Sequence, residues 1–594
     1  MRQRLTTVAI CLATSGWLPA AHAAEKLEIE FLGVEGMLLE NVQALSSLQR
    51  LSRSEELDAD MIARLTQRAP AEARTALRPY GYYAPEVSTE LVQEDDVWHA
   101  RVTIRPGEPV LLVEQRVEIT GSGSEEPFLR QALATSPLRT GARLSHPDYD
   151  RLKGELLRAA AANGYLDATF TRGQLLVDPA MREARAYVTL ETGERYRFGA
   201  TTIAQDFLRP GLVRRYLRYE EGDWYDASAL LRTQFALDDS QYFAVVEVLP
   251  EERDRERRIA PIRIAAEPAK RNVYTIAAGY ATDTRTRGTL RWEDRRVNAN
   301  GHRMRAEIRG SSPEESVKLA YVIPWTDPAL EKLAFEARAF NEQRADVETS
   351  GSSFRVGLTQ VRGRWQRVLS VTAESTRDEI TTSDGTSTEI SRTQSELLVP
   401  GISYSLLPPG FLGVNAVPRG FQVELLGSTT ALGSDTDFTR LVVRDERRFR
   451  LADRWHLQLR GEIGVSAVAE FQELPAQYRF FAGGDRSVRG FGLNELSPPG
   501  PPDENGNPTE GVGGENKLVA SIEIERDLPR DFRIAAFYDT GDAFNDWSDP
   551  LEYSIGVGVR WKLPMLMIGL DVAQALSEPG KNPRLHLNIT QVLL

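Results

Sequence analysis

The sequence has little cysteine and histidine, and it lacks the local motifs of common enzymes. Its 594 residues include one cysteine, Cys11, and six histidines, so no disulfide can form within the chain. The histidines show no spacing such as H-E-x-x-H, which argues against zinc. Neither a G-x-S-x-G elbow nor a G-x-G-x-x-G or G-K-[ST] phosphate loop is present. We therefore expect no enzyme, no catalytic residue, no metal and no cofactor.

Long apolar runs are also lacking, except for a short one at the N-terminus. Residues 1–23 carry two arginines, an apolar core from Val8 to Leu18, and Ala-His-Ala at residues 21–23. This pattern predicts a secretory signal peptide, because the apolar core is too short for a membrane anchor. Cys11 lies inside it. Removal of the two arginines changes the formal net charge from -13 to -15, and an acidic exported chain is a poor nucleic-acid binder.

The N-terminal half contains a repeated pattern, a helix that ends in a turn with a tyrosine and continues into a strand. The stretches LRPYGYYAPEVSTE, RAAAANGYLDATFT and LDDSQYFAVVEVL place Tyr82, Tyr165 and Tyr242 at equivalent positions. Each unit is interpreted as strand, two helices, strand, strand, a small α+β domain with helices on one sheet face. The alternative is one larger α/β domain whose helix ends coincide by chance. The predicted domains span 24–108, 109–193 and 194–269, and each tyrosine should pack within its own unit.

From about residue 270 onward, apolar and polar residues alternate. In LEYSIGVGVRWKLP, one parity is apolar and the other carries Ser554, Arg560 and Lys562. Roughly sixteen such segments follow Asn272, most with the ~9–11 residues that a membrane strand needs. An even number suits a closed antiparallel barrel, whereas a soluble sandwich would also alternate. We predict a 16-stranded antiparallel transmembrane β-barrel over 270–594, with interfacial tryptophans at positions 292, 325, 365, 455 and 561.

The segment RFFAGGDRSVRGFG places an arginine, Arg489, in a loop rich in glycine. Two later strands, KLVASIEIERDL and RIAAFYDTGDAF, place Glu523 and Asp539 on the parity that faces the barrel lumen. An arginine that enters the lumen could bind two carboxylates at once through its forked guanidinium. The alternative is an exposed arginine without a partner. Gly490 would let the backbone pass close to the wall, and Phe491 would cover the ion pair.

The same three segments resemble signatures of the Omp85 superfamily of outer-membrane assembly barrels. The resemblance implies that loop 484–516 folds into the lumen and that Arg489 of the V-R-G-F motif pairs with Asp539 and Glu523. The motif and the loop glycines occupy Val488, Arg489, Gly490, Phe491, Gly483 and Gly484. The repeats resemble the POTRA domains of this superfamily (POTRA 1, 2 and 3 over the three ranges above). The presence of three such repeats, together with the segments GERYRFG and ATDTRTRGTLRW, resembles the TamA family within this superfamily.

The resemblance also implies a location and a function. The barrel would lie in contact with the lipid of the bacterial outer membrane, with the N-terminal domains in the periplasm. It would promote insertion or secretion of client outer-membrane proteins of the autotransporter type, by strand addition at a lateral seam near Gly279 and Ile589. An inner-membrane-anchored TamB-like subunit would bind through POTRA 1. The alternative function is a two-partner-type channel that exports one dedicated polypeptide through its lumen; a passive porin would need no periplasmic repeats.

Overall fold

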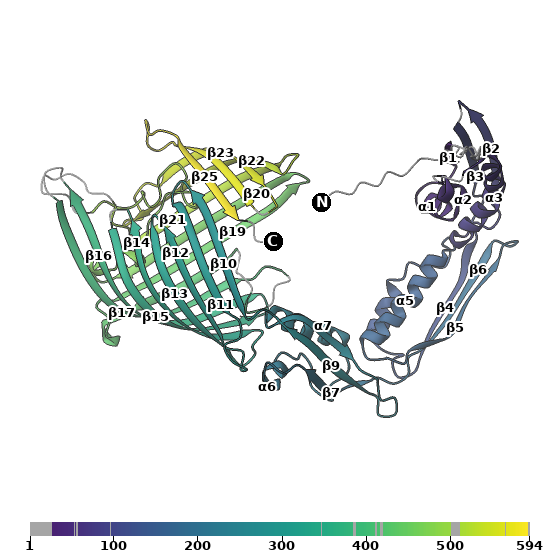
Figure 1. The fold of residues 1–594 in the computed structure, drawn as a ribbon, viewed down its shortest axis with the longest axis horizontal. Coiled ribbons are helices and arrows are strands. Elements are labelled where there is room, and N and C mark those ends of the chain that lie inside the picture. Colours follow the sequence, from purple (N-terminus) through teal and green to yellow (C-terminus); the bar gives the residue numbers. More distant parts are fainter. Residues whose placement is uncertain are drawn as a thin grey trace, which may run out of the picture. The chain divides into compact units, whose positions relative to one another are not determined.

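The computed structural model describes residues 26–591 except 53, 55–56, 96, 346, 384–387, 410–412, 416–419, 501–510 and 565. The expected signal peptide, 1–23, lies outside the described residues. The chain forms three three-stranded sheets with helices and one closed barrel of sixteen strands (Figure 1). It divides into two compact units: one holds the first two sheets, and the other holds the barrel with most of the third α+β domain. No helix of the described residues is both long and apolar enough to cross a membrane.

The first two sheets have the same topology, in which the last strand along the chain lies in the centre. Their orders are β1-β3-β2 and β4-β6-β5, and each central strand pairs parallel with the first strand and antiparallel with the second. Helices pack on one face of each sheet (Figure 1). The first sheet's elements are β1 (Lys26–Leu32), α1 (Gly36–Leu45), α2 (Ser47–Leu51), α3 (Ala59–Leu77), η1 (Arg78–Tyr80), β2 (Glu86–Glu94) and β3 (Val97–Arg105). The second sheet's elements are β4 (Leu111–Thr120), α4 (Pro127–Ala134), α5 (His146–Ala162), β5 (Thr169–Asp178) and β6 (Glu183–Glu191).

Helix α5 illustrates why these segments fold as they do. The Ser145 hydroxyl caps its first turn by accepting a hydrogen bond from the Asp148 amide at 3.3 Å. Leu152, Leu156 and Ala160 repeat every four residues, and all three are fully buried against the sheet. The apolar stripe in the sequence therefore becomes the core of this domain.

The third sheet has the order β7-β9-β8. Its elements are β7 (Arg197–Ala204), α6 (Pro210–Arg214), α7 (Ala227–Asp239), β8 (Phe243–Pro250) and β9 (Ile259–Pro268). This domain is attached to the barrel by polar contacts. The Arg218 guanidinium donates to both carboxylate oxygens of Asp327, at 2.6 and 3.1 Å. Such a two-point contact fixes orientation as well as position.

The three repeat tyrosines pack at the helix-to-strand corners, but their hydroxyls differ. The Tyr165 hydroxyl bonds Glu126 of its own domain at 2.9 Å. The Tyr82 hydroxyl accepts a hydrogen bond from Arg143, which precedes α5, and the Tyr242 hydroxyl donates to a backbone carbonyl in a barrel turn. The rings of Tyr82 and Tyr165 pack in the cores of their own domains, as expected, but the hydroxyls of Tyr82 and Tyr242 bond to groups outside their units. The Tyr242 phenol is buried and needs a partner, which the barrel turn supplies.

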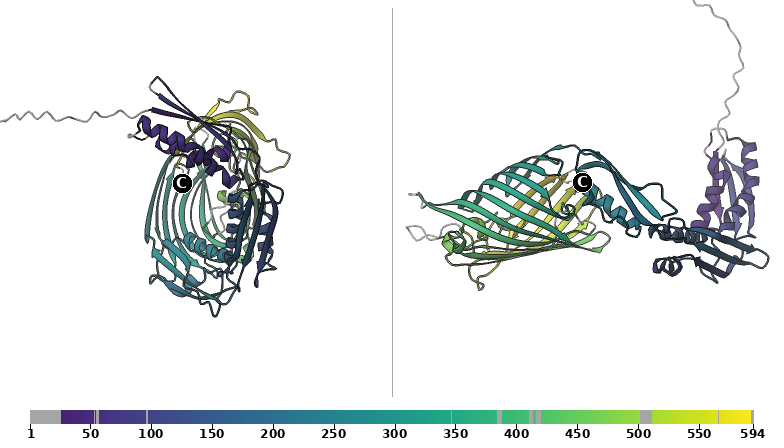
Figure 2. Two further views of the ribbon diagram at one scale, coloured as in Figure 1. Left: turned by 90° about the vertical axis from the view of Figure 1, so that its right-hand side faces the viewer. Right: turned by 90° about the horizontal axis from the view of Figure 1, so that it is seen from below.

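The barrel closes through sixteen strands, each antiparallel to its neighbours, and Figure 2 shows their inclination to the barrel axis. The strands are β10 (Asn272–Ala281), β11 (Arg285–Asp294), β12 (Arg303–Ser311), β13 (Glu314–Pro324), β14 (Glu331–Arg344), β15 (Val347–Arg362), β16 (Trp365–Ser383), β17 (Thr388–Leu406), β18 (Gln422–Ser428), β19 (Phe438–Ala452), β20 (Trp455–Val468), β21 (Asn516–Asp527), β22 (Phe532–Phe544), β23 (Glu552–Lys562), β24 (Leu566–Ala575) and β25 (Arg584–Gln591). The predicted number of strands is confirmed.

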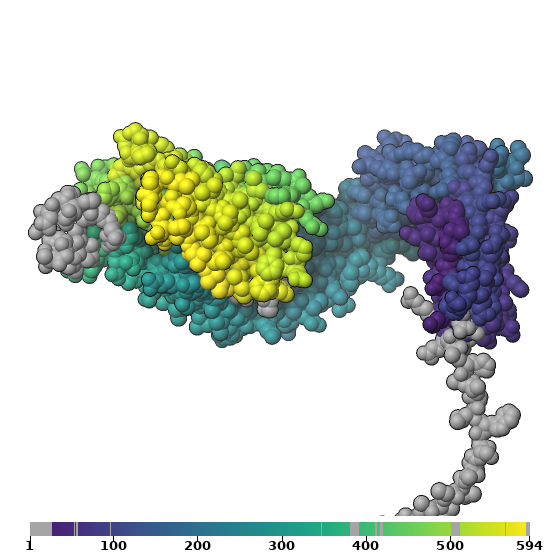
Figure 3. Space-filling model, turned by 90° about the horizontal axis from the view of Figure 1, so that it is seen from above, coloured from purple at the N-terminus to yellow at the C-terminus, as the bar shows by residue number. Residues whose placement is uncertain are grey.

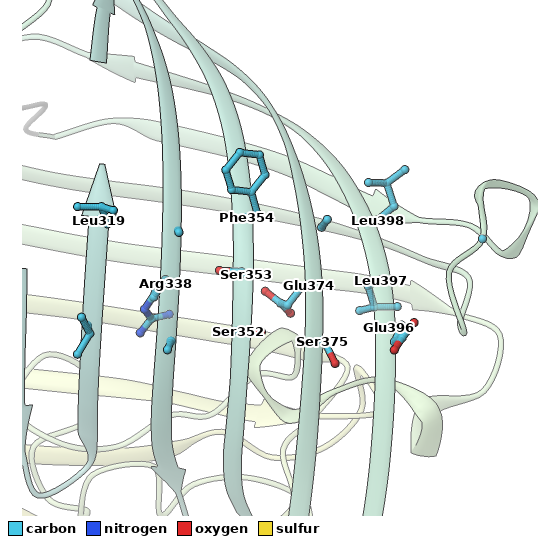
Figure 4. Close-up of a pocket in the computed structure, with 15 residues that line it drawn as sticks. Leu319, Arg338, Ser352, Ser353, Phe354, Glu374, Ser375, Glu396, Leu397 and Leu398 are labelled. Atoms are coloured by element: carbon cyan, nitrogen blue, oxygen red, sulfur yellow. The ribbon is translucent and has the colours of Figure 1, made fainter. Parts of the chain in front are cut away.

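Alternation along the strands separates an apolar outer face from a polar lumen. On β21, Ile522 and Ile524 are 43% and 44% exposed, whereas Glu523 between them is buried. Figure 4 shows the same alternation across β13 to β17, where Phe354 lies on one parity and Arg338 on the other. The outer residues face lipid, because an aqueous surface would not place so many isoleucines and valines in one band.

The five tryptophans that were expected to form interfacial girdles all lie at one end of the barrel. Trp365 and Trp455 are the first residues of β16 and β20, and Trp292, Trp325 and Trp561 lie at or just beyond strand ends. Because neighbouring strands run antiparallel, all of these positions fall at the end where β10 begins. That end also carries the third α+β domain.

Candidate functional site

The segment between β20 and β21 returns into the lumen and packs against the wall. Phe480, Ala482, Val488 and Phe491 are buried in one cluster with the wall residue Val519. Short bridges, such as Ala482↔Leu496 and Phe480↔Gly514, join the two sides of the loop to each other. The loop is thus a folded insert, although its residues 501–510 lie outside the described chain.

Two consecutive glycines make the turn that carries the arginine. Gly483 and Gly484 have φ angles of +95° and +91°, a region that side chains with a Cβ rarely adopt. A Cβ at Gly483 would also collide with the carbonyl oxygen of Gly492. The glycine pair therefore sets the loop conformation that presents Arg489.

Arg489 binds both predicted carboxylates. Its Nε and Nη2 donate to the two oxygens of Asp539 at 2.7 and 2.9 Å, and Nη1 donates to Glu523 at 2.7 Å. Asp539 is fully buried, and the Arg489 side chain is 4% exposed. The backbone amide of Arg489 also donates to Asp539 at 3.2 Å. Burial alone would lower the pKa of the guanidinium, but its hydrogen bonds to Asp539 and Glu523 raise the pKa above the ordinary value.

Two wall residues that the sequence did not single out complete this contact. The Phe537 ring lies under the guanidinium, with its centroid 3.2 Å from the Arg489 Cζ. The Ser521 hydroxyl donates to Asp539 at 2.6 Å. The expectation that Phe491 covers the ion pair is wrong, since Phe491 packs in the apolar cluster with the Lys581 ammonium over its ring. Phe537 shares the inward parity of Asp539, and this parity was the available signal.

The ion pair extends along the wall into a charge network. Arg560 donates to Glu523 at 3.4 Å and to Asp571 at 2.9 Å, and Asp571 lies 3.7 Å from Arg489. These residues come from β21, β23 and β24, so one loop arginine is bound to several neighbouring strands. Two arginines and three carboxylates share the site, and removal of one arginine would leave buried charge unpaired.

Gly490 allows the loop backbone to approach the wall closely. Its amide donates to the Ser554 hydroxyl at 3.1 Å. A Cβ at this position would lie 2.6 Å from the Ser554 Cβ and 2.9 Å from the Ala575 Cα. The predicted reason for this glycine, close approach, thus matches the geometry; its φ angle is not in the left-handed region.

The seam where the barrel closes is short. Among the described residues, β10 and β25 pair only at Tyr280↔Ile589 and Ala281↔Asn588, whereas β10 pairs with β11 at ten positions. Figure 3 shows the last strands, in yellow, beside the first barrel strands, in teal. The outward residues Tyr274 and Ile276 are 70% and 77% exposed, well above the 43% of Ile522 in a fully paired strand. Most of the outer edge of β10 therefore has no neighbouring strand among the described residues.

Gly279 and Ile589 meet at this seam through an arginine. A Cβ at Gly279 would lie 2.8 Å from Arg287 Nε and 3.1 Å from the Ile589 carbonyl oxygen. Arg287 Nη2 lies 3.4 Å from that same oxygen and donates to it. Beyond the strand pairing, the Thr282 amide donates to the Leu587 carbonyl at 3.0 Å. Gly279 therefore leaves room for the Arg287 side chain, which hydrogen-bonds to β25 near its end.

Two family models match the chain. The model described as the Omp85 superfamily domain covers residues 298–591, and the model described as POTRA domain TamA domain 1 covers residues 28–106. Together they match the greater part of the barrel and the first α+β domain.

One curated relative and two solved structures are similar to parts of the chain. The outer membrane protein assembly factor BamA of Nitratidesulfovibrio vulgaris (strain Hildenborough) is 30% identical over 142 residues, which are 23% of this chain and 17% of that protein. The crystal structure of BamA from Haemophilus ducreyi lacking POTRA domains 1–3 has a TM-score of 0.66 and 16% identity, over 81% of this chain and 99% of that chain. CdiB from Acinetobacter baumannii has a TM-score of 0.44 and 11% identity, over 94% and 99%.

The matched segment spans less than a fifth of the curated relative's length, and the likeness to solved structures concerns the fold. The closed barrel, the three mixed sheets and the two family models nevertheless agree on one class and one location: the barrel lies in the outer membrane, with the α+β domains in the periplasm. The chain carries an Omp85 superfamily domain over residues 298–591 and a TamA-type first POTRA domain over residues 28–106.

Proposed function

We propose that this protein promotes the insertion or secretion of other outer-membrane proteins, of the autotransporter type, by adding their strands at the seam between β10 and β25. It acts by binding and strand exchange, without catalysis. The POTRA domains would receive unfolded clients in the periplasm, and POTRA 1 would bind an inner-membrane-anchored TamB-like subunit. The first sheet supports the latter role, because β1 and β2 are both edge strands and an edge can accept a partner strand.

The observation that carries this proposal is the two-pair seam. A strand edge in lipid leaves amide and carbonyl groups unpaired, which costs several kcal/mol for each group. The edge of β10 from Asn272 to Gly279 has no paired strand among the described residues. A client strand that adds there would satisfy those groups and lower the free energy.

Export of a dedicated polypeptide through the lumen is the competing function. The inward loop opposes it, because Arg489 is bound to the wall by four hydrogen bonds to two carboxylates. A chain that passes through the lumen would have to displace this buried network. Strand addition at the seam leaves it in place.

A disulfide across the seam tests the proposal. Ala281→Cys and Asn588→Cys change directly opposed residues, whose Cα atoms in an antiparallel pair lie ~4.5–5.5 Å apart, within disulfide reach. The only native cysteine, Cys11, lies in the expected signal peptide. We expect the oxidised protein to remain folded and to lose client assembly in reconstituted vesicles until reductant is added.

The matched control joins β10 to its other neighbour. Ala277→Cys with Thr289→Cys crosslinks two strands that already pair along their length, so its oxidation should leave assembly unchanged. If the seam disulfide also leaves the assembly rate unchanged, the seam does not open and the lumen route replaces this proposal.

A further inference from the structure

Three side chains from distant parts of the chain converge at the joined end of the seam. Asp283 lies in the turn after β10, Asp485 in the inward loop, and His586 in β25. One potential ligand atom from each lies within 4.8 Å of the other two. His586 Nδ1 is 3.8 Å from Asp283 Oδ1 and directly contacts Asp485 Oδ1.

Apart from the ion-pair contact between His586 Nδ1 and Asp485 Oδ1, the three converging atoms have no hydrogen-bond partner in the described part of the chain. The other polar atoms of His586 and Asp283 bond to backbone groups of the inward loop. His586 Nε2 lies 2.6 Å from the Arg489 carbonyl oxygen, and Asp283 Oδ2 accepts the Asp485 amide at 2.7 Å. Because a carbonyl can only accept, Nε2 carries a proton and donates it. In the neutral imidazole, Nδ1 therefore presents a lone pair to two carboxylate oxygens.

Lone pairs that face one another in a buried space repel, and either a proton on Nδ1 or a metal ion between the three atoms relieves the repulsion. The side chains of Asp283 and His586 are 4% and 3% exposed, and that of Asp485 is 16% exposed. The neighbouring Arg584 lies 3.8 Å from Glu495, with which it forms an ion pair. Burial of two carboxylates without a bound positive charge is costly.

We propose that Asp283, Asp485 and His586 bind a divalent transition metal ion of the Zn²⁺ class. One imidazole nitrogen and two carboxylate oxygens are ligands that Zn²⁺ accepts, with water free to complete the tetrahedron. Ca²⁺ prefers six to eight oxygen ligands and would not select an imidazole. The hydrogen bond from His586 to the Arg489 carbonyl is the outer contact that orients a metal-binding histidine.

The site joins the two ends of the barrel to the loop. Asp283 follows the first strand, His586 belongs to the last, and Asp485 lies four residues before Arg489. Bound metal would thus fasten the paired end of the seam next to the Thr282–Leu587 bond. This inference depends on the geometry of the site and not on the proposed assembly activity.

Zinc titration of the full-length protein tests the site. The protein in detergent micelles, stripped with a chelator and dialysed, should bind one Zn²⁺ per chain in isothermal titration calorimetry, and Ca²⁺ should not compete. His586→Ala and Asp283→Asn should each raise the zinc Kd about tenfold or more. Removing a residue that only hydrogen-bonds to a metal ligand already lowers metal affinity about 10-fold or more, and these variants remove ligands. Asp485→Asn, on the loop, provides the same test if a strand variant fails to fold.

His456→Ala is the matched control, because His456 pairs with Asp527 alone, at 2.8 Å. Its zinc affinity should equal that of the wild type. If the amide of Leu587 exchanges only when the seam opens and the metal site is lost, zinc at a hundred times its Kd should slow that exchange by on the order of 100-fold. Equal zinc affinity in the wild type and the His586 and Asp283 variants, or zinc-independent exchange, would mean that a protonated imidazole pairs with the carboxylates, and the metal site would be rejected.

Discussion

The wall formed by β16 and β17 and the seam formed by β10 and β25 are built from the same alternating pattern, yet they differ greatly in backbone pairing. The two wall strands are each 19 residues long and pair along their whole length. The seam strands have 10 and 8 residues and pair at two positions among the described residues. Length alone does not explain this, because β18 has seven residues and pairs at seven positions with β19. Since unpaired backbone groups are costly in lipid, the extent of pairing decides where the barrel is closed firmly and where another strand can add.

The seam is compensated by side chains and by the loop. Arg287 donates to the Ile589 carbonyl, and the imidazole of His586 donates to the Arg489 carbonyl. The Arg489 side chain is in turn bound to β21 through Glu523 and to β22 through Asp539. The loop therefore connects the firmly paired part of the wall to the last strand, which has few backbone bonds of its own on the seam side.

Loss of Arg489 should have the largest effect on this arrangement. Arg489→Ala leaves Asp539 and Glu523 buried without their cation, which we expect to cost about 3–5 kcal/mol. The loop should leave the wall, and external protease should cut residues 484–500 faster than in the wild type. Arg489→Lys should recover little, because an ammonium cannot reproduce the fork.

Arg486→Ala is the control for this experiment. Arg486 lies on the same loop, is exposed, and carries the same charge, so its removal should leave both the cleavage rate and the thermal unfolding of the barrel unchanged. Equal cleavage of the wild type and Arg489→Ala would mean that the ion pairs do not hold the loop.

A smaller effect should follow from a single methyl group at the contact between loop and wall. Gly490→Ala places a Cβ 2.6 Å from the Ser554 Cβ and 2.9 Å from the Ala575 Cα, and such overpacking costs about 1–3 kcal/mol. Thermal unfolding in detergent should detect the loss. Gly288→Ala on β11, where a Cβ meets nothing within 4 Å, should unfold like the wild type; a matching loss there would indicate a general effect of replacing glycine.

The sequence predicted those parts of the site that depend on parity. Alternation places Glu523 and Asp539 on inward positions but leaves an exposed arginine as the alternative, and their pairing with Arg489 is implied by the resemblance to the Omp85 superfamily. Alternation also places Phe537 and Ser521 on the inward face, but their contacts with Arg489 and Asp539 depend on the strand register, which alternation does not supply. The cluster of Asp283, Asp485 and His586 could not be expected from ligand spacing, because barrel closure and the return of the loop into the lumen together bring these residues to one place.

The smallest predicted effect concerns the seam itself. Arg287→Ala removes the Nη2 group that donates, at long range, to both the Ile589 carbonyl (3.4 Å) and the Asn588 side chain (3.5 Å). Because both are long, we expect a loss of the size of one hydrogen bond, about 0.5–1.5 kcal/mol. The Leu587 amide, which donates to the Thr282 hydroxyl at 2.6 Å, should then exchange about 2- to 13-fold faster, with chelator present, while amides of β16 and β17 stay protected. The control is Arg291→Ala, on the same strand. Arg291 binds Glu307 of β12 at 2.7 Å and no described residue of β25, so its loss should leave the exchange rate of the Leu587 amide unchanged. Equal acceleration in both variants would indicate that the first strands loosen as a whole, and the contrast between wall and seam would then not depend on this one side chain.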